Sequence, residues 1–354
     1  MSVRAAVVHA PGRFGVERFP APDPEPGAVV LRMLYSGICG TDKHTWRGES
    51  KQYAGTDHER DAAYPLICGH ENVGVVEAVG PGPPPFDDRG RPLRVGDRVV
   101  PAANLTCGRC EFCSDDRAPY YLCTALEDYG NSMTCAEPPH LFGGWAELMY
   151  LRPGTRVFGV PDELDSRLAA MTELLSVTHG LDRFMRAGDT VLVIGAGPLG
   201  MVHLIKADLL GAGRLVAVDL LPERLDLARA CGADAVEPEP ADVVVDCSGR
   251  SDTLPDALHL VRPGGVVIEA GAFVDMGPVQ IDPNRDICVR DVTIRGIGGE
   301  DLAHYAPSLR LLARHSDRFA PLITHRVGLE EVGDALELAQ TGAAMKVLVA
   351  PNGE

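Results

Sequence analysis

Four cysteines lie close enough in the sequence to bind a single metal ion. They are Cys107, Cys110, Cys113 and Cys123. Thiolates separated by two residues can reach one tetrahedral zinc ion, and four protein ligands leave no position open for a substrate. The pattern therefore predicts a structural zinc site, with Cys135 as a second candidate for the fourth ligand. The alternative is a set of ordinary free thiols.

A glycine-rich segment could bind the phosphates of a dinucleotide. It follows an apolar run at 191–194, precedes a predicted helix, and reads Gly195-Ala196-Gly197-Pro198-Leu199-Gly200. The three glycines permit a tight turn, a close approach of the backbone to a pyrophosphate, and close packing of the helix on the strand. The helix N-terminus adds free N–H groups and partial positive charge. The alternative is a glycine-rich turn in another kind of α/β protein.

Three residues downstream could complete this site. Asp219 ends the next predicted strand, and its carboxylate would bind both ribose hydroxyls and repel a 2′-phosphate, which predicts NAD rather than NADP. Arg224 is expected to lie along the adenosine. Gly271 follows the apolar run 266–268 and is expected to offer backbone groups to the nicotinamide carboxamide.

Three further segments contain residue types that bind zinc or transfer protons. The residues are Cys39, Thr41 and His44, then His70 and Glu71, and finally Glu173. By spacing alone none of these segments is specific. An isolated cysteine is commonly a small buried apolar side chain, a histidine can belong to a core, and glutamates are commonly solvated or paired.

The elements that would position these residues change in type along the chain. Up to about residue 150, short β-branched runs lie between prolines and glycines, which predicts strands joined by turns. After about residue 165, apolar runs alternate with helical segments, the first at 198–210. Runs that are apolar on both faces indicate a parallel sheet covered by helices on both sides. A late strand is predicted at 346–349.

Composition limits the classes of function. The chain has 354 residues, which suggests two domains, and its formal net charge is −17. An acidic surface disfavours nucleic acid and anionic lipid as partners. No apolar run is long enough to cross a bilayer, and Pro11 interrupts the apolar N-terminal segment. We therefore expect a cytoplasmic protein that acts on a small molecule.

The order of the segments resembles the zinc-dependent medium-chain alcohol and polyol dehydrogenases, over residues 4–350. The motifs that carry the resemblance are Gly37-Ile38-Cys39-Gly40-Thr41-Asp42, Gly69-His70-Glu71-x2-Gly74, the four cysteines, the nucleotide motif, Arg262-Pro263-Gly264-Gly265 and Ala343-x2-Lys346-Val347. The stretch around Glu173, Thr172 to Val177, is similar to the sorbitol and threonine dehydrogenase branch.

The resemblance implies an α/β protein with two domains. One is a GroES-like, mostly β catalytic domain, expected over 1–172 and 300–354. The other is a doubly wound parallel-sheet (Rossmann) domain for NAD, expected over 173–299. Because family members are dimers or tetramers, the resemblance also implies a homodimer or homotetramer.

The resemblance further implies two zinc ions, of which the catalytic one is held by Cys39 and His70. Glu71 and Glu173 both remain candidates for the third ligand, and either choice leaves one position open for substrate or water.

The implied reaction is hydride transfer between an alcohol and NAD. Zinc lowers the pKa of the substrate hydroxyl, Thr41 takes its proton, and His44 passes the proton toward water. The expected substrate carries a secondary alcohol, polyol or sugar-like hydroxyl. A biosynthetic carbonyl reductase and a catalytically silent NAD-binding protein are the alternatives.

Three departures from the family pattern stand out. Cys123 follows Cys113 after nine residues, where the family usually has fewer. Leu174 replaces a proline. The segment 47–64 is longer than is typical and is expected to form part of a pocket rim. Trp46 is the candidate for lining the substrate pocket, whereas for Tyr53 a structural role is favoured.

Overall fold

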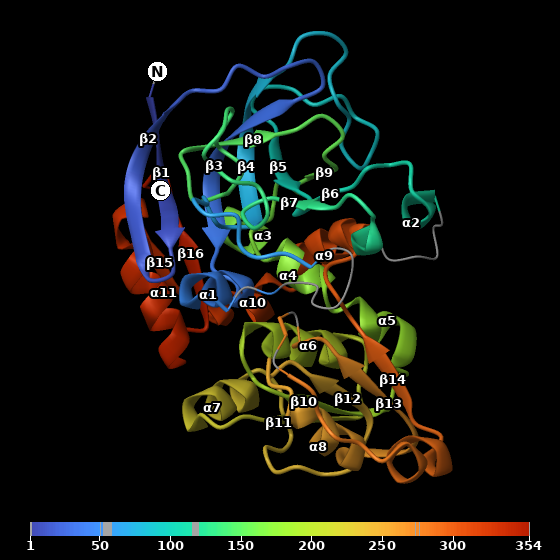
Figure 1. Cartoon of the computed structure of the whole chain (residues 1–354). Helices are drawn as coiled ribbons and strands as arrows, with labels where there is room; N and C mark the ends of the chain where they lie inside the picture. Colours follow the sequence, from blue (N-terminus) through green and yellow to red (C-terminus); the bar gives the residue numbers. More distant parts are fainter. Residues whose placement is uncertain are drawn as a thin grey trace. The chain divides into compact units, whose positions relative to one another are not determined.

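The computed structural model describes residues 2–49, 51, 59–114, 120–272, 274–275 and 277–353. The chain divides into two units, one of residues 1–173 with 301–354 and the other of residues 174–300 (Figure 1). Tyr53 lies outside the described residues.

The first unit is built around a seven-stranded sheet. Its strand order is β15-β16-β3-β4-β5-β9, with β8 also paired to β3. The strands are β3 (Val29–Gly37), β4 (Glu71–Val79), β5 (Arg98–Pro101), β8 (Leu148–Leu151), β9 (Val157–Gly159), β15 (Ile323–Val327) and β16 (Lys346–Val349). The predicted late strand is β16, and it pairs with β3. The mostly β character of this part of the chain is therefore confirmed.

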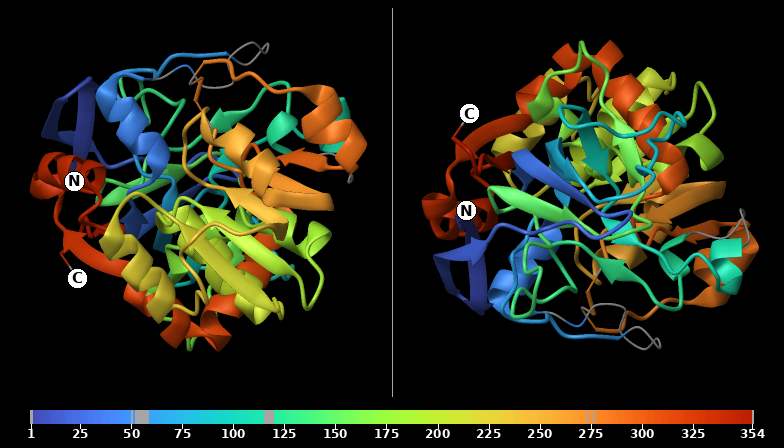
Figure 2. Two further views of the ribbon diagram at one scale, coloured as in Figure 1. Left: turned by 90° about the horizontal axis from the view of Figure 1, so that it is seen from below. Right: turned by 90° about the horizontal axis from the view of Figure 1, so that it is seen from above.

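Two antiparallel hairpins accompany this sheet. They are β1 (Ser2–Ala10) with β2 (Arg13–Pro20), and β6 (Asn104–Leu105) with β7 (Glu127–Asp128). The C-terminal elements lie beside the N-terminal hairpin in every view (Figures 1 and 2). The unit therefore brings together segments from both ends of the chain around one hydrophobic core.

Short helices connect the strands of the first unit. They are α1 (Gly40–Arg47), α2 (Glu111–Ser114), α3 (Ser166–Ala169), α4 (Thr172–Ser176, which runs into the second unit), α9 (Leu302–Arg314), α10 (Ser316–Phe319) and α11 (Val332–Thr341). The 3₁₀ turns are Tyr120–Leu122, Ala320–Leu322 and Leu329–Glu331. Helix α1 begins three residues after β3 ends and stops at Gly48, whose φ of +74° suits a glycine at a helix C-terminus.

The second unit holds a five-stranded, wholly parallel sheet in the order β11-β10-β12-β13-β14. Its elements are α5 (His179–Phe184), β10 (Thr190–Ile194), α6 (Pro198–Leu209), β11 (Arg214–Val218), α7 (Pro222–Ala230), β12 (Ala241–Asp246), α8 (Thr253–Leu260), β13 (Val261–Glu269), the turns Pro283–Ile287 and Cys288–Arg290, and β14 (Thr293–Gly296). The valine-rich central strands are buried, as the apolar runs predicted. The doubly wound sheet is therefore confirmed.

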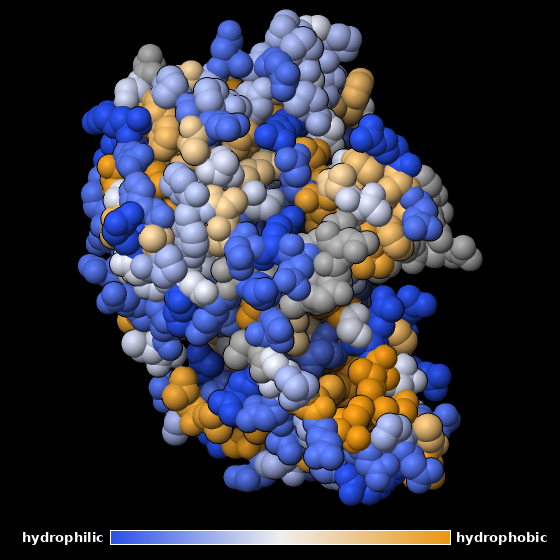
Figure 3. Space-filling model, in the orientation of Figure 1, coloured by the Kyte–Doolittle hydropathy of each residue, from blue (hydrophilic) through white to orange (hydrophobic). Residues whose placement is uncertain are grey.

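Polar side chains cover much of the face drawn in Figure 3, in keeping with 83 charged residues in the sequence, 33 basic and 50 acidic. Within the described ranges, no helix combines the length and the hydropathy that crossing a membrane requires.

Candidate functional site

Cys39 occupies the position just before helix α1. Its backbone N–H donates to Asp42 Oδ2 at 2.7 Å. An acidic side chain at the third position of a helix commonly accepts this N–H and stabilises the first turn. The carboxylate of Asp42 is fully buried, and the backbone N–H of Gly69 is also close to it. Burial raises the pKa of Asp42, while His70 and these two N–H groups lower it.

His70 lies between Gly69 and the first residue of β4, and it is 8% exposed. Its Nδ1 lies 3.9 Å from Asp42 Oδ1, and Cys39 is close enough to raise its pKa. Burial alone would lower the pKa of His70, but Cys39, Asp42 and Glu173 outweigh burial and hold that pKa well above its usual value. The surroundings of the ring therefore favour a positive charge.

The two candidate glutamates lie in different surroundings. Glu173, in α4, is 6% exposed and close enough to His70 to raise its pKa. Glu71 is fully buried, and both of its carboxylate oxygens accept hydrogen bonds from Lys346 Nζ, at 2.6 and 2.7 Å. Lys346 also donates to Ile38 O at 3.1 Å. Cys39, His70 and Glu173 thus offer a thiol, an imidazole and a carboxylate, the thiol and the carboxylate close enough to the imidazole to raise its pKa, and these are ligand types that bind zinc.

The sequence did not single out Asp42 and Lys346 by role, although both lie inside the motifs quoted above. The signal for Lys346 is a charged residue at the start of an otherwise apolar strand. The signal for Asp42 is an acidic residue three positions after the helix-capping Cys39.

Helix α1 carries the two candidate proton-transfer residues. Thr41 is half-buried. His44 Nδ1 lies 3.1 Å from Glu49 Oε2 and 3.0 Å from a guanidinium nitrogen of Arg47. Burial lowers the pKa of His44 despite the hydrogen bond with Glu49, so the imidazole is neutral, and able to accept a proton, near neutral pH.

The four predicted structural cysteines come together. Their sulfur atoms all lie within 4.8 Å of one another, with 3.4 Å between the sulfurs of Cys110 and Cys113. Cys135 is elsewhere, since its thiol donates to Pro65 O at 3.3 Å. Cys123 is therefore the fourth member of the group.

Backbone N–H groups also point at these sulfurs. The pKa of Cys110 is lowered to about 6, mostly by the N–H of Thr124 and to a lesser extent by other donors. Burial instead raises the pKa of Cys123 to about 12. The N–H groups of Cys107 and Ala125 donate to Cys123 Sγ at 3.2 and 3.5 Å. A thiol that is hard to ionise alone loses its proton when it ligates zinc, so this set fits a tetrathiolate ion.

The glycine motif of the second unit has the backbone that its residues suggested. Gly195 has φ +88°, and a Cβ there would lie 2.8 Å from Ser248 Cα. A Cβ on Gly200 would overlap the carbonyl oxygen of Gly195, whereas one on Gly197 would meet only Arg224, at 3.8 Å. The space beside Gly197, at the start of α6 where Pro198 and Leu199 begin the helix, is thus open to a ligand.

Asp219 is held at the end of β11 by three donors. Its oxygens accept the N–H of Ala196 at 2.8 Å, the N–H of Leu221 at 2.9 Å and the Arg224 guanidinium at 3.3 Å. Arg224 thus lies beside the carboxylate expected to bind the ribose.

Gly271 is less available than the sequence suggested, because its N–H donates to Glu269 Oε1 at 3.0 Å. Burial, together with the charge of Asp246, raises the pKa of Glu269 to about 7. Asp246 and Glu269 are neighbours at the ends of β12 and β13.

Trp46 was expected to line the substrate pocket. It is only 8% exposed and packs edge-on against Phe14, with ring centroids 6.4 Å apart, so it belongs to the hydrophobic core of the first unit.

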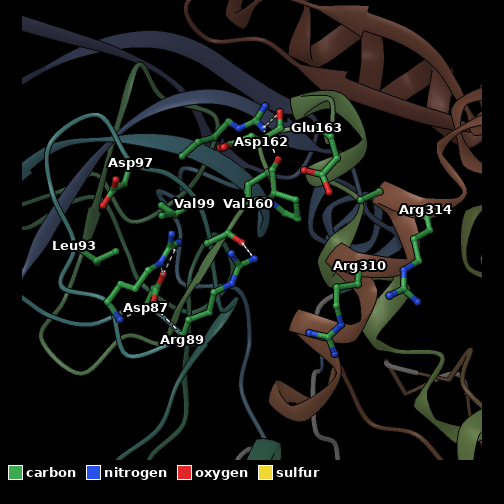
Figure 4. Close-up of a pocket in the computed structure, with 15 residues that line it drawn as sticks. Asp87, Arg89, Leu93, Asp97, Val99, Val160, Asp162, Glu163, Arg310 and Arg314 are labelled. Atoms are coloured by element: carbon green, nitrogen blue, oxygen red, sulfur yellow. Dashed lines mark hydrogen bonds and ion pairs between the residues drawn. The ribbon is translucent and has the colours of Figure 1, made fainter.

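A separate cavity of about 440 Å³ lies in the first unit. Arg310 and Arg314 extend toward it from α9, opposite Asp87 and Arg89 (Figure 4). Five arginines and four carboxylates line it, and Asp87 is already paired with Arg91 at 2.7 Å. Its charges nearly cancel, and none of the candidate zinc ligands lines it.

Comparison with known proteins gives two family matches. The GroES-like domain of alcohol dehydrogenases matches residues 25–162, and the zinc-binding dehydrogenase family matches residues 198–314. The first match spans Cys39, His70 and the four clustered cysteines.

Similar proteins cover almost the whole chain. The 5-exo-hydroxycamphor dehydrogenase of Pseudomonas putida is 32% identical over 98% of each chain. Sorbitol dehydrogenase of Ovis aries is 30% identical over 97% of this chain and 95% of its own. The crystal structure of an alcohol dehydrogenase from Thermotoga maritima has a TM-score of 0.91 at 30% identity, over 99% of this chain and 100% of that one.

Proposed function

Because the chain belongs to the family of zinc-binding medium-chain alcohol dehydrogenases, whose cofactors are zinc and NAD or NADP, we propose that it transfers a hydride between a secondary alcohol and NAD. The observation that carries the proposal is that the buried His70 imidazole lies 3.9 Å from Asp42 Oδ1 and within the electrostatic reach of Cys39 and of the buried Glu173. The names of two relatives, a hydroxycamphor dehydrogenase and a sorbitol dehydrogenase, support a cyclic or polyol hydroxyl as the substrate class.

Cys39, His70 and Glu173 would hold the catalytic zinc. Glu71 is the less suitable third ligand, because binding zinc would cost it the buried ion pair with Lys346. Three protein ligands leave the open position that a catalytic zinc site requires. When bound, zinc supplies a Lewis acid that makes the substrate hydroxyl more acidic, and NAD supplies the hydride acceptor.

The residues of α1 would then remove the proton. Thr41 Oγ1 accepts it from the substrate hydroxyl, and the His44 imidazole relays it to water. The lowered pKa of His44 suits this role, since a neutral ring can accept a proton at neutral pH.

Two further assignments complete the proposal. Asp219 would bind both ribose hydroxyls of the cofactor, and its negative charge would repel the extra phosphate of NADP. Cys107, Cys110, Cys113 and Cys123 would hold a structural zinc, which orders a loop with only a small hydrophobic cluster of its own.

A substrate panel tests the proposal. The purified protein is assayed for zinc content and for nicotinamide reduction with cyclic secondary alcohols, polyols and primary alcohols, with NAD and NADP in parallel. We expect zinc at both sites and a higher kcat/KM with NAD on secondary alcohols. Full zinc content without turnover of any hydroxyl or carbonyl compound would instead favour a catalytically silent NAD-binding protein.

A further inference from the structure

Both backbone polar groups of Gly69, the residue before His70, interact with neighbouring residues. Its N–H is close enough to the carboxylate of Asp42 to lower the pKa of that group. Its carbonyl oxygen accepts two hydrogen bonds, from Gly144 N–H at 2.9 Å and from Asn72 Nδ2 at 3.1 Å. Gly69 has φ +91°, a backbone conformation that other residues adopt only with strain. The two hydrogen bonds to its carbonyl oxygen help to hold the turn in this conformation.

Three buried polar side chains surround the same turn. Ser36, Asn72 and Trp145 are at most 1% exposed. Ser36 on β3 is the register partner of Asn72 on β4. A Cβ on Gly69 would overlap Ser36 Oγ and lie 2.7 Å from Trp145 Nε1, and one on Gly144 would overlap Asn72 Oδ1. The three side chains therefore leave room only for glycine at both positions.

The burial of these three polar side chains lowers the stability of the fold. Within the part of the chain that the structure describes, Ser36 Oγ, Asn72 Oδ1 and Trp145 Nε1 have no hydrogen-bond partner. A buried polar atom without a partner destabilises the fold, and an apolar side chain of similar size would avoid that loss. Departures from good packing chemistry concentrate at functional sites. Asn72 differs from the other two, because its Nδ2 makes a hydrogen bond to the residue next to His70.

We propose that Asn72 is a positioning residue for the catalytic zinc site. Its amide holds the Gly69 carbonyl, and thereby keeps the imidazole of His70 turned toward Cys39 and Asp42. Ser36 and Trp145 fill the space around the turn. The inference rests on the proposed function, since it requires zinc at Cys39 and His70.

The test measures zinc release rather than turnover alone. Zinc-loaded wild-type protein and the variants Asn72→Ala and Asn72→Asp are mixed with a coloured chelator, and release from the two sites is separated by comparison with Cys39→Ser and Cys110→Ser. We expect both Asn72 variants to release the catalytic zinc about 10–100-fold faster, as for other residues that orient metal ligands. Release of the structural zinc should stay unchanged.

Two controls separate positioning from general destabilisation. Asn104→Ala removes another buried asparagine of the first unit, in β6. Ser36→Ala removes a neighbouring hydroxyl that makes no hydrogen bond to any residue that the structure describes. Neither should change the release of the catalytic zinc. The inference is overturned if the Asn72 variants lower the melting temperature while the catalytic zinc leaves at the wild-type rate. If the wild-type protein binds zinc only at the four cysteines, the proposed function itself fails.

Discussion

Lys346 Nζ lies 2.6 Å from Oε1 and 2.7 Å from Oε2 of Glu71, and both side chains are fully buried. The two residues are 275 positions apart in sequence. Strand β16, which begins with Lys346, pairs with β3, and β3 pairs with β4, which begins with Glu71. This ion pair engages the carboxylate adjacent to His70. It leaves Glu173 as the glutamate whose charge acts on the His70 imidazole.

Removing the lysine should destabilise the first unit. We expect Lys346→Met to lower the free energy of unfolding by about 3–5 kcal/mol, because the carboxylate of Glu71 stays buried without its partner. Urea denaturation followed by circular dichroism measures the change. The double variant Lys346→Met with Glu71→Gln should recover most of the loss. A single variant as stable as the wild type would show that the pair is not required.

The two zinc sites should respond differently to loss of a cysteine. Cys39→Ser should remove the catalytic zinc and abolish turnover, while the melting temperature changes little, because a catalytic ion contributes less to folding than a structural one. Cys110→Ser should mainly lower the melting temperature. Metal analysis and calorimetry on both variants check this. A purely kinetic defect in Cys110→Ser would contradict the structural assignment.

The Thr41 hydroxyl should matter for the chemical step alone. We expect Thr41→Val, which keeps the size of the side chain, to lower kcat by about 10²-fold through loss of proton transfer. The dissociation constant for NAD, measured by fluorescence titration, should stay the same. An unchanged kcat would remove Thr41 from the proton relay.

Asp219 should set the choice of cofactor. We expect Asp219→Ser to raise KM for NAD by about 10–100-fold, which corresponds to losing hydrogen bonds to a charged group, and to improve kcat/KM with NADP. Steady-state kinetics with both cofactors decide the matter. Equal losses with NAD and NADP would show that the variant only disturbs the turn that Asp219 holds through Ala196 and Leu221.

Glu269 should make stability depend on pH. Its pKa is raised from 4.5 to about 7 by burial and by Asp246, so the folded protein holds this proton more tightly than the unfolded chain. The stabilising effect is complete below about pH 4.5 and is lost as the pH rises through about 7. We expect Glu269→Gln, which cannot ionise, to show a smaller fall in melting temperature between about pH 5 and 8. Parallel curves for both proteins would contradict this.

Local patterns predicted much of the fold and part of the candidate site. The glycine motif, the apolar runs around it and the four cysteines are each contained in a short segment, so their spacing was enough to predict what they form. The choice between Glu71 and Glu173 could not be made in this way. Our proposal of Glu173 rests on the ion pair between Glu71 and Lys346, and that pairing is set by the order of strands in the sheet.

Similar limits apply to Trp46, Asp42 and Asn72. Trp46 was expected to line the substrate pocket, but Phe14 from the N-terminal hairpin packs against its ring. Asp42 in α1 approaches His70 just before β4, and the Asn72 side chain turns back to the Gly69 carbonyl three residues earlier. Sequence spacing does not predict the direction in which such side chains point.

The most direct test of the catalytic zinc site is anomalous diffraction at the zinc edge from crystals of the zinc-loaded protein. We predict two peaks per chain, one among the four clustered cysteines and one about 2.0–2.3 Å from Cys39 Sγ, a His70 ring nitrogen and a Glu173 oxygen, with Glu71 still bound to Lys346. A single peak at the cysteine cluster, with Cys39 and His70 free of metal, would contradict the proposed mechanism.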